Sequence, residues 1–539
     1  MKKTNSGRFF AFLLAVLAVE AGISMWRGQL LVGKHEGDML HLLEIVFRMA
    51  DGEWPHLDFM TPIGFMAFAP IALFVKLGAG VGHAILYAQA LVGLCLVPLA
   101  WRAGLSRLTG YWPYLFGAVV IVLATALVHG EAQRSVSISM HYNRWAWAAA
   151  FLAILIATLP PVPERRNQLL DGVVVGLALA FMALCKVTYF AAFVLPVAVG
   201  LLAHKQNRSF VAALTTGLIV AALVTAFAGV DFWLAYLRDL LRVSASEVRS
   251  NPGEPFAAVV AAPAYIGGSL VLLAGVILLR QGGKSVEGMM LLLLTPGFFY
   301  VTFQNFGNDP QWLLLLGILL FAARPGHEVK NSFGWDMRNA VGLAAAAAFA
   351  MIVPSAINLT YSPLRHLGQN PEHHTPLLPR ATLHGDLKTA SIRAHRAEKR
   401  VPMDGPGSGM EEWAVRAERE EPLMLNGVPL EQCEIMLGLP AWFDSIARSL
   451  EEGGHRGERI FFADLFSSIW LFGEFEPLEN GAPWYYGGLP GFDTADYVLV
   501  PLCPVLPPVR KLVLERIEER GVTLEEVERT PLYILLRKG

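Results

Sequence analysis

A polar stretch rich in carboxylates and imidazoles follows the first long apolar run of the chain, at residues 34–64 (KHEGDMLHLLEIVFRMADGEWPHLDFMTPIG). Its ionisable side chains include Glu36, Asp38 and Asp58 together with His35 and His56. Unpaired charge at membrane depth is costly, so such a cluster usually marks a pathway or a chemical site. The alternative for Asp38 is a helix N-cap, because a helical pattern follows it directly.

The elements that position this stretch are membrane helices. Of the 539 residues, 54% are hydrophobic and only 16% are charged, and the mean hydropathy is +0.46. Apolar runs of the length that a bilayer of about 30 Å requires follow one another along the chain. The formal net charge of −2 provides no basic stripe for a phosphate backbone, so we expect no nucleic-acid partner.

The distribution of Lys and Arg predicts the topology. The first run, residues 9–23, follows Lys2, Lys3 and Arg8 and has no A-x-A-type site after it, so it is expected to be an uncleaved signal anchor with a cytoplasmic N-terminus. Five basic segments are then expected inside: residues 101–107, 163–166, 204–208, 280–284 and 324–338. About eleven spans follow: 9–25, 82–100, 113–129, 144–160, 169–185, 188–203, 210–229, 263–280, 287–303, 310–323 and 339–357. This odd number predicts that the C-terminus lies outside.

Two regions depart from the repeated spans. Residues 62–77 are apolar but begin with Pro62 and contain Pro70, which predicts a re-entrant or interfacial helix. After residue 357 the chain is polar, and strand-like and helix-like segments alternate in RIFFADLF, DYVLVPLC, VRKLVLERIEERG, VTLEEVE and LYILLRK. The predicted domains are therefore a membrane domain, 1–357, with a first outer loop at 26–61, and an outer α/β domain, 358–539, whose segment 360–409 is a tether. Cys433 and Cys503 are the only cysteines of the outer domain, and the sequence leaves open whether they form a disulfide.

The first outer loop resembles that of GT-C-type membrane glycosyltransferases, which include protein O-mannosyltransferases and the lipid A aminoarabinose transferase. The resemblance lies in HEGDMLHLL, DGEWPHLDF and TPIGF: an acid after the first span, an interfacial helix, a G-x-x-P turn and a D-F-x-x-P-x-G segment. It extends to the layout of about 360 residues. Several members have Asp-Glu at the catalytic position, whereas Met39 follows Asp38 here, so Glu36 remains an alternative acid.

The resemblance implies that a sugar moves from a polyprenyl phosphate to an acceptor hydroxyl on the outer face, typically with inversion. A hydroxyl is a poor nucleophile at neutral pH, so a carboxylate must accept its proton, and Asp38 is the candidate base. Asp58 could position the acceptor, bind a divalent cation or cap the turn before Pro62. His35 and His56 lack the spacing of a zinc site, no metal ligand set is predicted, and His56 is a candidate substrate contact. The cofactor stays unknown, with a divalent cation as one candidate.

A phosphate donor requires cations and polar groups from other segments. Lys186 lies at the outer end of a predicted span, where it could bind phosphate or extend to the interface as an anchor. Arg144, His141 and Asn143 in MHYNRWAW form a second group suited to phosphate or sugar hydroxyls. The third group, in QNFGNDPQW, consists of Gln304, Asn305, Asn308 and Asp309 and could bind sugar, although an Asn-Asp-Pro turn also occurs without a function.

The sequence is compatible with three functional classes. A lipid-linked sugar transferase of the bacterial cytoplasmic membrane explains the acidic first loop and the outer domain; its expected partners are a polyprenyl-phosphate sugar donor, membrane lipids and a lipid, glycan or protein acceptor. A secondary transporter would show internal repeats and interrupted helices near the midplane, and the sequence shows no internal repeat. A non-enzymatic protein of envelope assembly explains the outer domain but assigns no role to the loop charges. The outer domain has no phosphate loop or nucleophile elbow, which favours a role in acceptor or partner binding.

Overall fold

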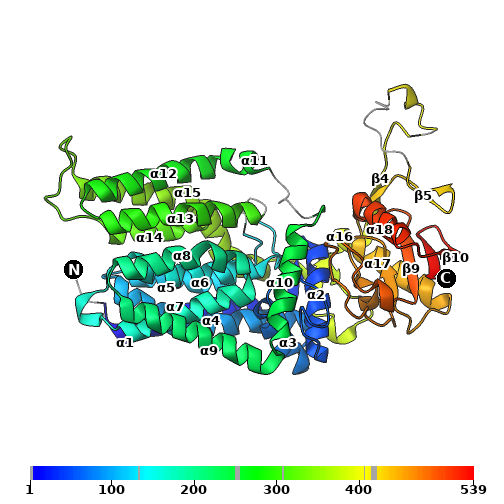
Figure 1. Ribbon diagram of the computed structural model, residues 1–539, viewed down its shortest axis with the longest axis horizontal. Helices are drawn as coiled ribbons and strands as arrows, with labels where there is room; N and C mark the ends of the chain where they lie inside the picture. Colours follow the sequence, from blue (N-terminus) through cyan, green and yellow to red (C-terminus); the bar gives the residue numbers. More distant parts are fainter. Residues whose placement is uncertain are drawn as a thin grey trace.

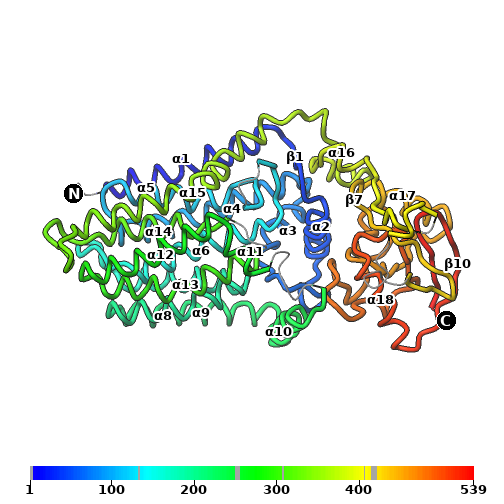
Figure 2. The backbone as a smooth tube through the Cα atoms, turned by 90° about the horizontal axis from the view of Figure 1, so that it is seen from above, coloured from blue at the N-terminus to red at the C-terminus, as the bar shows by residue number. Residues whose placement is uncertain are grey.

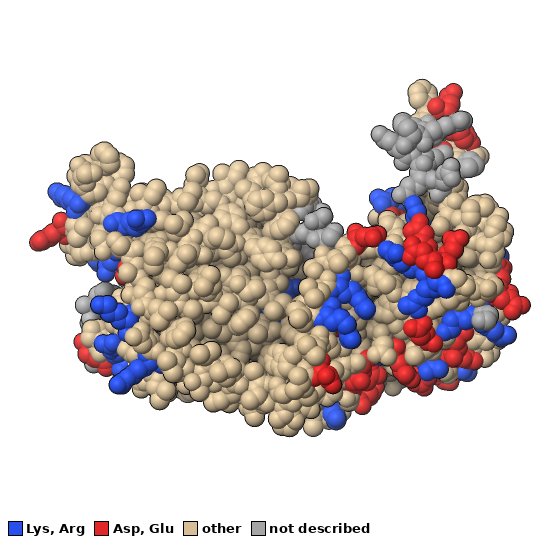
Figure 3. All heavy atoms as spheres, viewed as in Figure 1, with Lys and Arg blue, Asp and Glu red and all other residues tan. Residues whose placement is uncertain are grey.

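The computed structural model describes residues 4–130, 134–248, 255–305, 309–405, 407–413 and 422–538. Long helices run side by side along the longest axis of the molecule, and a smaller α/β domain lies at one end (Figure 1). On the face drawn in Figure 3, a broad band of uncharged residues covers the helical part, and Lys, Arg, Asp and Glu gather at its two ends and over the smaller domain. This distribution is what a bilayer requires of a spanning protein.

Among the described residues, seven helices are long and apolar enough to cross a membrane: α1 (Ser6–Met25), α4 (Val81–Arg107), α7 (Gln168–Cys185), α9 (Asn207–Ala228), α12 (Pro263–Gln281), α13 (Ser285–Gln304) and α15 (Met337–Leu367). Three shorter apolar helices are α5 (Trp112–Thr125), α8 (Val187–Ala203) and α14 (Trp312–Ala322). The central helix α6 (His141–Thr158) is buried at every residue except Tyr142. Each of the predicted spans coincides with one of these helices, which confirms a polytopic helical fold.

The basic segments gather at the end of the bundle that holds the N-terminus. The Thr4 hydroxyl donates a hydrogen bond to the Gly110 carbonyl at 3.0 Å, and the Trp101 indole donates to the Ser6 carbonyl at 3.1 Å. The C-terminal domain lies at the opposite end (Figure 2). The predicted separation of the basic connections from the C-terminal domain is therefore present in the fold.

Short helices cover the other end of the bundle. They are α2 (Glu36–Asp51), η1 (Phe65–Ala67), α3 (Ala69–Lys76), α10 (Asp231–Ser244) and α11 (Phe256–Ala261). The proline-led run 62–77 thus forms a 3-10 turn and a helix of eight residues, which is too short to span a bilayer. The prediction of a non-spanning segment there is confirmed, as is that of an amphipathic helix after Asp38.

The C-terminal domain contains a four-stranded sheet in the order β10-β11-β9-β8. Its strands are β8 (Ile460–Phe462), β9 (Tyr497–Pro501), β10 (Leu524–Arg529) and β11 (Tyr533–Lys538), and its longer helices are α17 (Leu439–Glu452) and α18 (Pro507–Glu519). Strand β9 is buried along its whole length, which explains its unbroken apolar sequence YVLVP. The five segments predicted as strand-like or helix-like correspond to β8, β9, α18, β10 and β11 in this order.

The described part of the predicted tether, 360–405 and 407–409, includes short elements that contact the first loop and α4. Strand β3 (Leu387–Ala390) pairs in parallel with β1 (Leu30–Val32) of the first loop and antiparallel with β2 (His374–Pro376). The Asp386 carboxylate accepts hydrogen bonds from the first amides of α4, at Gly82 and His83. The predicted boundary at 357/358 falls inside α15, which continues to Leu367.

The remaining small elements lie mainly in the outer part of the chain. They are η2 (Pro163–Arg165), η3 (Pro371–His373), η4 (Thr382–His384), α16 (Ser391–His395), β4 (Glu398–Arg400), η5 (Glu411–Trp413), β5 (Met424–Leu425), β6 (Val428–Pro429), β7 (Glu434–Leu437), η6 (Ser468–Leu471) and η7 (Phe492–Thr494).

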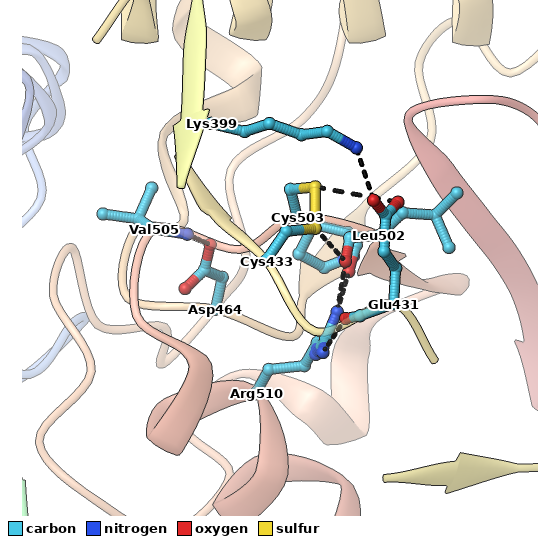
Figure 4. Close-up of a disulfide and its surroundings, with 9 residues drawn as sticks. Lys399, Glu431, Cys433, Asp464, Leu502, Cys503, Val505 and Arg510 are labelled. Atoms are coloured by element: carbon cyan, nitrogen blue, oxygen red, sulfur yellow. Dashed lines mark hydrogen bonds and ion pairs between the residues drawn. A yellow bond between two sulfur atoms is a disulfide. The ribbon is translucent and has the colours of Figure 1, made fainter. Parts of the chain in front are cut away.

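A disulfide joins Cys433 to Cys503, with Cα atoms 5.0 Å apart (Figure 4). This answers the question that the sequence left open. Glu431 lies beside both sulfur atoms, and these three residues are the one His/Cys/Asp/Glu group with metal-like spacing among the residues that the structure describes. Because the two sulfurs are bonded to each other, this group is not a thiolate metal site.

Candidate functional site

Asp38 lies in the first turn of α2, where a residue of a distant loop holds its carboxylate. His35 occupies the N-cap position, so Asp38 is not the N-cap. The Ser139 hydroxyl donates a hydrogen bond to Oδ2 of Asp38 at 2.5 Å. Asp38 is half-buried, and this contact orients one carboxylate oxygen while the other makes no hydrogen bond within the described residues.

The loop that carries Ser139 is tied to the start of α2 by further hydrogen bonds. The Ser139 amide donates to Oγ of Ser137 at 3.2 Å, and Nδ1 of His35 lies 2.9 Å from the same oxygen. Two residues of this network, His35 and Met140, have positive φ angles of 68° and 51°. Such backbone is costly for residues other than Gly and tends to occur at functional sites. Neither serine was predicted as a site residue, because the local sequence offers no signal beyond the alternation SVSIS between two spans.

Glu36 is held by the outer domain. Arg393 of α16 donates from Nε to Oε2 at 2.7 Å and from Nη2 to Oε1 at 2.9 Å. Both carboxylate oxygens of Glu36 are therefore occupied, and the residue is buried, with 5% of its surface exposed. Of the two acids that the sequence left as alternatives, Asp38 is the one with an oxygen still available to a substrate.

Lys186 stands at the break between α7 and α8. Its ammonium lies 5.3 Å from the centre of the Tyr142 ring, and Tyr142 is the second residue of α6. The break is packed against the TPIG turn, because a Cβ on Gly64 would lie 2.1 Å from the Leu184 carbonyl oxygen. Only glycine allows this approach, so the first-loop motif and the Lys186 segment are built against each other.

The group at the start of α6 is buried and mostly structural. Arg144 donates to the carbonyls of Val128 and Ala126 beyond the end of α5, the latter at 2.8 Å. His141 donates from Nε2 to the Ala67 carbonyl at 2.8 Å. The side-chain amide of Asn143 is buried and makes no hydrogen bond to any described residue. A buried amide without a partner suggests a site that is completed by water or ligand.

The third predicted group is only partly described. Gln304 accepts a hydrogen bond from the Thr188 hydroxyl at 3.5 Å, and Asn305 donates to the Tyr189 hydroxyl at 3.1 Å. Both contacts reach the first residues of α8, directly after Lys186. Asp309 donates its amide to the Gly130 carbonyl at 3.2 Å, whereas Asn308 falls outside the described residues.

Asp58 and His56 lie in the turn that follows α2, and each has a local partner. Asp58 is exposed and accepts a hydrogen bond from the Trp54 amide at 2.6 Å, as a turn cap does. His56 is buried, and its Nδ1 lies 3.0 Å from Oδ2 of Asp239 on α10. The structure thus brings Asp38, Ser139 and Lys186 around the start of α6, and it places Asp58 and His56 on a separate side of the first loop.

The outer domain also holds the middle of α2. The Ser467 and Ser468 hydroxyls donate to the two oxygens of Glu44, at 2.7 and 3.1 Å. Burial raises the pKa of the Glu44 carboxyl, and the nearby Arg48 opposes this effect. The helix that carries Asp38 is therefore fixed by the outer domain at two points, Glu36 and Glu44.

Similarity to known proteins is found only at the level of solved structures. No family model matches the chain, and no curated protein does either. Among solved structures, the chain is similar to ArnT from Cupriavidus metallidurans bound to undecaprenyl phosphate. The sequences are 11% identical, the TM-score is 0.42, and the match covers 98% of this chain and 97% of the ArnT chain. The apo state of the same protein matches with a TM-score of 0.41 over 98% and 96%. ArnT is a lipid A aminoarabinose transferase of the GT-C type, the class that the first loop resembles. At a TM-score below 0.5, activity has to be argued from the site itself.

Proposed function

We propose that this protein is a membrane glycosyltransferase that moves a sugar from a polyprenyl phosphate to an acceptor hydroxyl on the outer face of the bacterial cytoplasmic membrane. The observation that carries the proposal is the Asp38 carboxylate, which Ser139 orients at 2.5 Å from the loop that leads into α6. Residues 1–357 would form the catalytic membrane domain, and the rest of the chain would bind acceptor and hold α2.

Asp38 has the properties of a general base. The first turn of α2 places it at the positive end of the helix dipole, where a negative charge is stabilised. Only the ionised form can accept a proton. One carboxylate oxygen is fixed by Ser139, and the other can face the acceptor hydroxyl.

Lys186 is the candidate cation for the donor phosphate. It lies at the break between two helices, beside Tyr142, and the neighbouring Thr188 and Tyr189 contact Gln304 and Asn305. Hydroxyl and amide groups of this kind suit a sugar phosphate. The unpaired amide of Asn143 is a further candidate for a sugar hydroxyl.

An apolar groove for the lipid chain begins next to Lys186. A groove of about 380 Å³ lies between α7, α8 and α9 and is lined by apolar side chains that include Ala183, Leu184 and Phe190. A polyprenyl chain is branched and apolar, so burying it there is favourable. A chain bound in this groove with its phosphate end toward Ala183 and Leu184 would bring the phosphate to the level of the break.

The proposed step balances as an inverting substitution. Asp38 takes the proton of the acceptor hydroxyl as its oxygen forms a bond to the anomeric carbon of the sugar. The bond from that carbon to the phosphate oxygen breaks, and the electron pair leaves with the polyprenyl phosphate, whose charge Lys186 offsets.

Loss and rescue of a glycan test the proposal. Envelope glycolipids and glycans are compared by mass spectrometry in cells with the gene, without it, and with Asp38→Asn. We expect one sugar modification to disappear without the gene and to remain absent with Asp38→Asn, while the matched control Asp51→Asn, at the other end of α2, restores it. Identical glycans in all four strains would refute the transferase function.

A further inference from the structure

A polar cavity lies between the membrane domain and the outer domain, away from Asp38 and Lys186. Its volume is about 320 Å³, and neither of those two residues lines it. One wall is made by α10 and the turn that holds His56, and the other by residues 488–493 and Arg520 of the outer domain. A cavity of this size accommodates a phosphorylated headgroup or a small phosphorylated ligand.

The exposed charge of the cavity is mainly positive. Arg238 and Arg242 are one turn apart on α10 and share a face, and Arg520 comes from the opposite wall. The side chain of Arg238 is 61% exposed and that of Arg520 is 44% exposed. Arg242 makes no ion pair with any other residue that the structure describes.

The two acids of the cavity offset this charge only in part. Asp239 is fully buried and bonds to the His56 ring at 3.0 Å and the Thr61 amide at 3.2 Å. It lines the cavity wall and its Oδ1 lies 3.7 Å from Nε of Arg238, so it offsets part of the charge of that arginine. Asp493 is exposed and pairs with Arg520 at 2.8 Å. An anionic ligand that enters meets three guanidinium groups and one accessible carboxylate.

The outer-domain wall adds backbone donors. Gly488, Leu489 and Gly491 line the cavity, and their amides donate to no acceptor among the described residues. The two glycines have positive φ angles of 69° and 78°, which turn the backbone in the way that anion-binding loops use. On the other wall, Nε2 of His56 is buried and also makes no hydrogen bond within the described part of the chain.

The exposed face of the helix that lines the cavity points to a position near lipid headgroups. Leu234, Leu237 and Leu241 form an exposed apolar stripe on α10, which suits a helix lying in the membrane interface. Figure 3 shows basic side chains gathered on this face, where the uncharged band of the helical domain meets the outer domain. Arginines at this level attract phosphate groups.

We propose that this cavity is a phosphate-binding site, separate from the donor site, which holds a phosphate monoester between Arg238 and Arg242 on one side and Arg520 on the other. The phosphate can come from an anionic lipid headgroup or from a free phosphorylated ligand. The site stands whether or not the protein transfers a sugar, because it depends on groups that the proposed reaction does not use.

Binding to the purified full-length protein tests the site with two probes. Inorganic phosphate is titrated by calorimetry in detergent, and native mass spectrometry measures retention of phosphatidic acid from an equal mixture with phosphatidylcholine. We expect wild-type protein to bind one or both probes and Arg242→Gln to weaken binding about tenfold or more, since a charge-assisted hydrogen bond is lost. Binding of phosphate alone identifies a free phosphate ligand, and binding of phosphatidic acid alone identifies a lipid headgroup. Binding of both probes, weakened together in Arg242→Gln, shows that the site accepts a phosphate from either source.

Three variants separate the site from misfolding and from the donor site. Asp493→Asn releases Arg520 and should tighten binding, an effect that a folding defect does not produce. Arg529→Gln, on the exposed surface of the outer domain, should leave binding unchanged. Lys186→Met, at the donor site, should leave the part of the binding that Arg242→Gln removes unchanged. The proposal is overturned if wild-type protein binds neither probe, if Arg242→Gln binds as wild type does, or if Lys186→Met abolishes binding.

Discussion

Arg393 and Glu36 lie 357 residues apart in the sequence and form an ion pair through two hydrogen bonds, of 2.7 and 2.9 Å. The pair fastens α16 of the outer domain to the first residue of α2, two residues before Asp38. The position of the proposed base therefore depends on the outer domain as well as on the membrane helices.

Breaking this pair should destabilise the contact between the domains. Arg393→Gln leaves a buried carboxylate with weaker partners, so we expect the free energy of unfolding to fall by about 1–3 kcal/mol. Thermal and denaturant unfolding in detergent measure the change. Arg396→Gln, in the same segment but with 61% of its side chain exposed, is the matched control and should change little. Equal stability of the two variants would contradict the clamp.

Asp38 and Ser139 should affect transfer to different extents. Asp38→Asn removes the proton acceptor and should lower turnover by about 10²–10⁴-fold with little loss of stability. Ser139→Ala removes only the orienting hydrogen bond and should lower turnover by about tenfold. Glu36→Gln should retain most activity, because its carboxylate faces Arg393. An active Asp38→Asn enzyme together with an inactive Glu36→Gln enzyme would move the base to Glu36.

Substitutions of Lys186 and Arg144 should have different effects, the first on donor binding and the second on folding stability. Lys186→Met should reduce kcat/KM for the polyprenyl donor by about 10–100-fold at nearly unchanged stability. Arg144→Gln should mainly lower stability, because the Val128 and Ala126 carbonyls lose their donor. Donor titration and thermal unfolding of both variants test this, with Lys76→Met on the exposed end of α3 as control. Normal donor use by Lys186→Met would place the phosphate elsewhere.

Asp464 should make the stability of the outer domain depend on pH. Burial raises the pKa of its carboxyl from 3.8 to about 6, although three backbone amides donate to it. The protonated form is favoured in the folded state, so its contribution is fully present below about pH 3.8 and is lost as the pH rises through 6. Relative to Asp464→Asn, the wild-type stability should fall between pH 4 and 6 by roughly 2–3 kcal/mol. A difference that is constant over this range would show an ordinary pKa.

The disulfide should stabilise the C-terminal domain, and it indicates the side of the membrane on which this domain lies. Cys433 and Cys503 close a separation of 70 residues, so the double change to Ser should cost roughly 2–4 kcal/mol. Disulfides form in oxidising compartments, so we also expect a reporter fused after Gly539 to be active only outside the cytoplasm. Peptide mapping without reductant should recover the linked peptides. Free thiols at both positions in protein purified from cells, or a reporter active in the cytoplasm, would place the C-terminal domain inside.

The sequence by itself determined the membrane fold. The spans, the interfacial α2 and the short run at 62–77 could all be placed, because hydropathy, length and proline content are properties of a single segment. The elements of the outer domain followed from period-2 and helical patterns for the same reason. The first loop could be selected as a site because its charge density stands out beside an apolar span.

Only the tertiary structure decided what the individual side chains do. Glu36 and Asp38 are chemically similar and two residues apart, yet Arg393 occupies the first and Ser139 orients the second. Arg144, expected at a phosphate, bonds to the carbonyls at the end of α5 instead. The phosphate cavity joins α10 to loops more than 200 residues away and has no local signature. Ion pairs and cavities depend on which segments meet, and that is set by the packing of the whole chain rather than by the composition of any one segment.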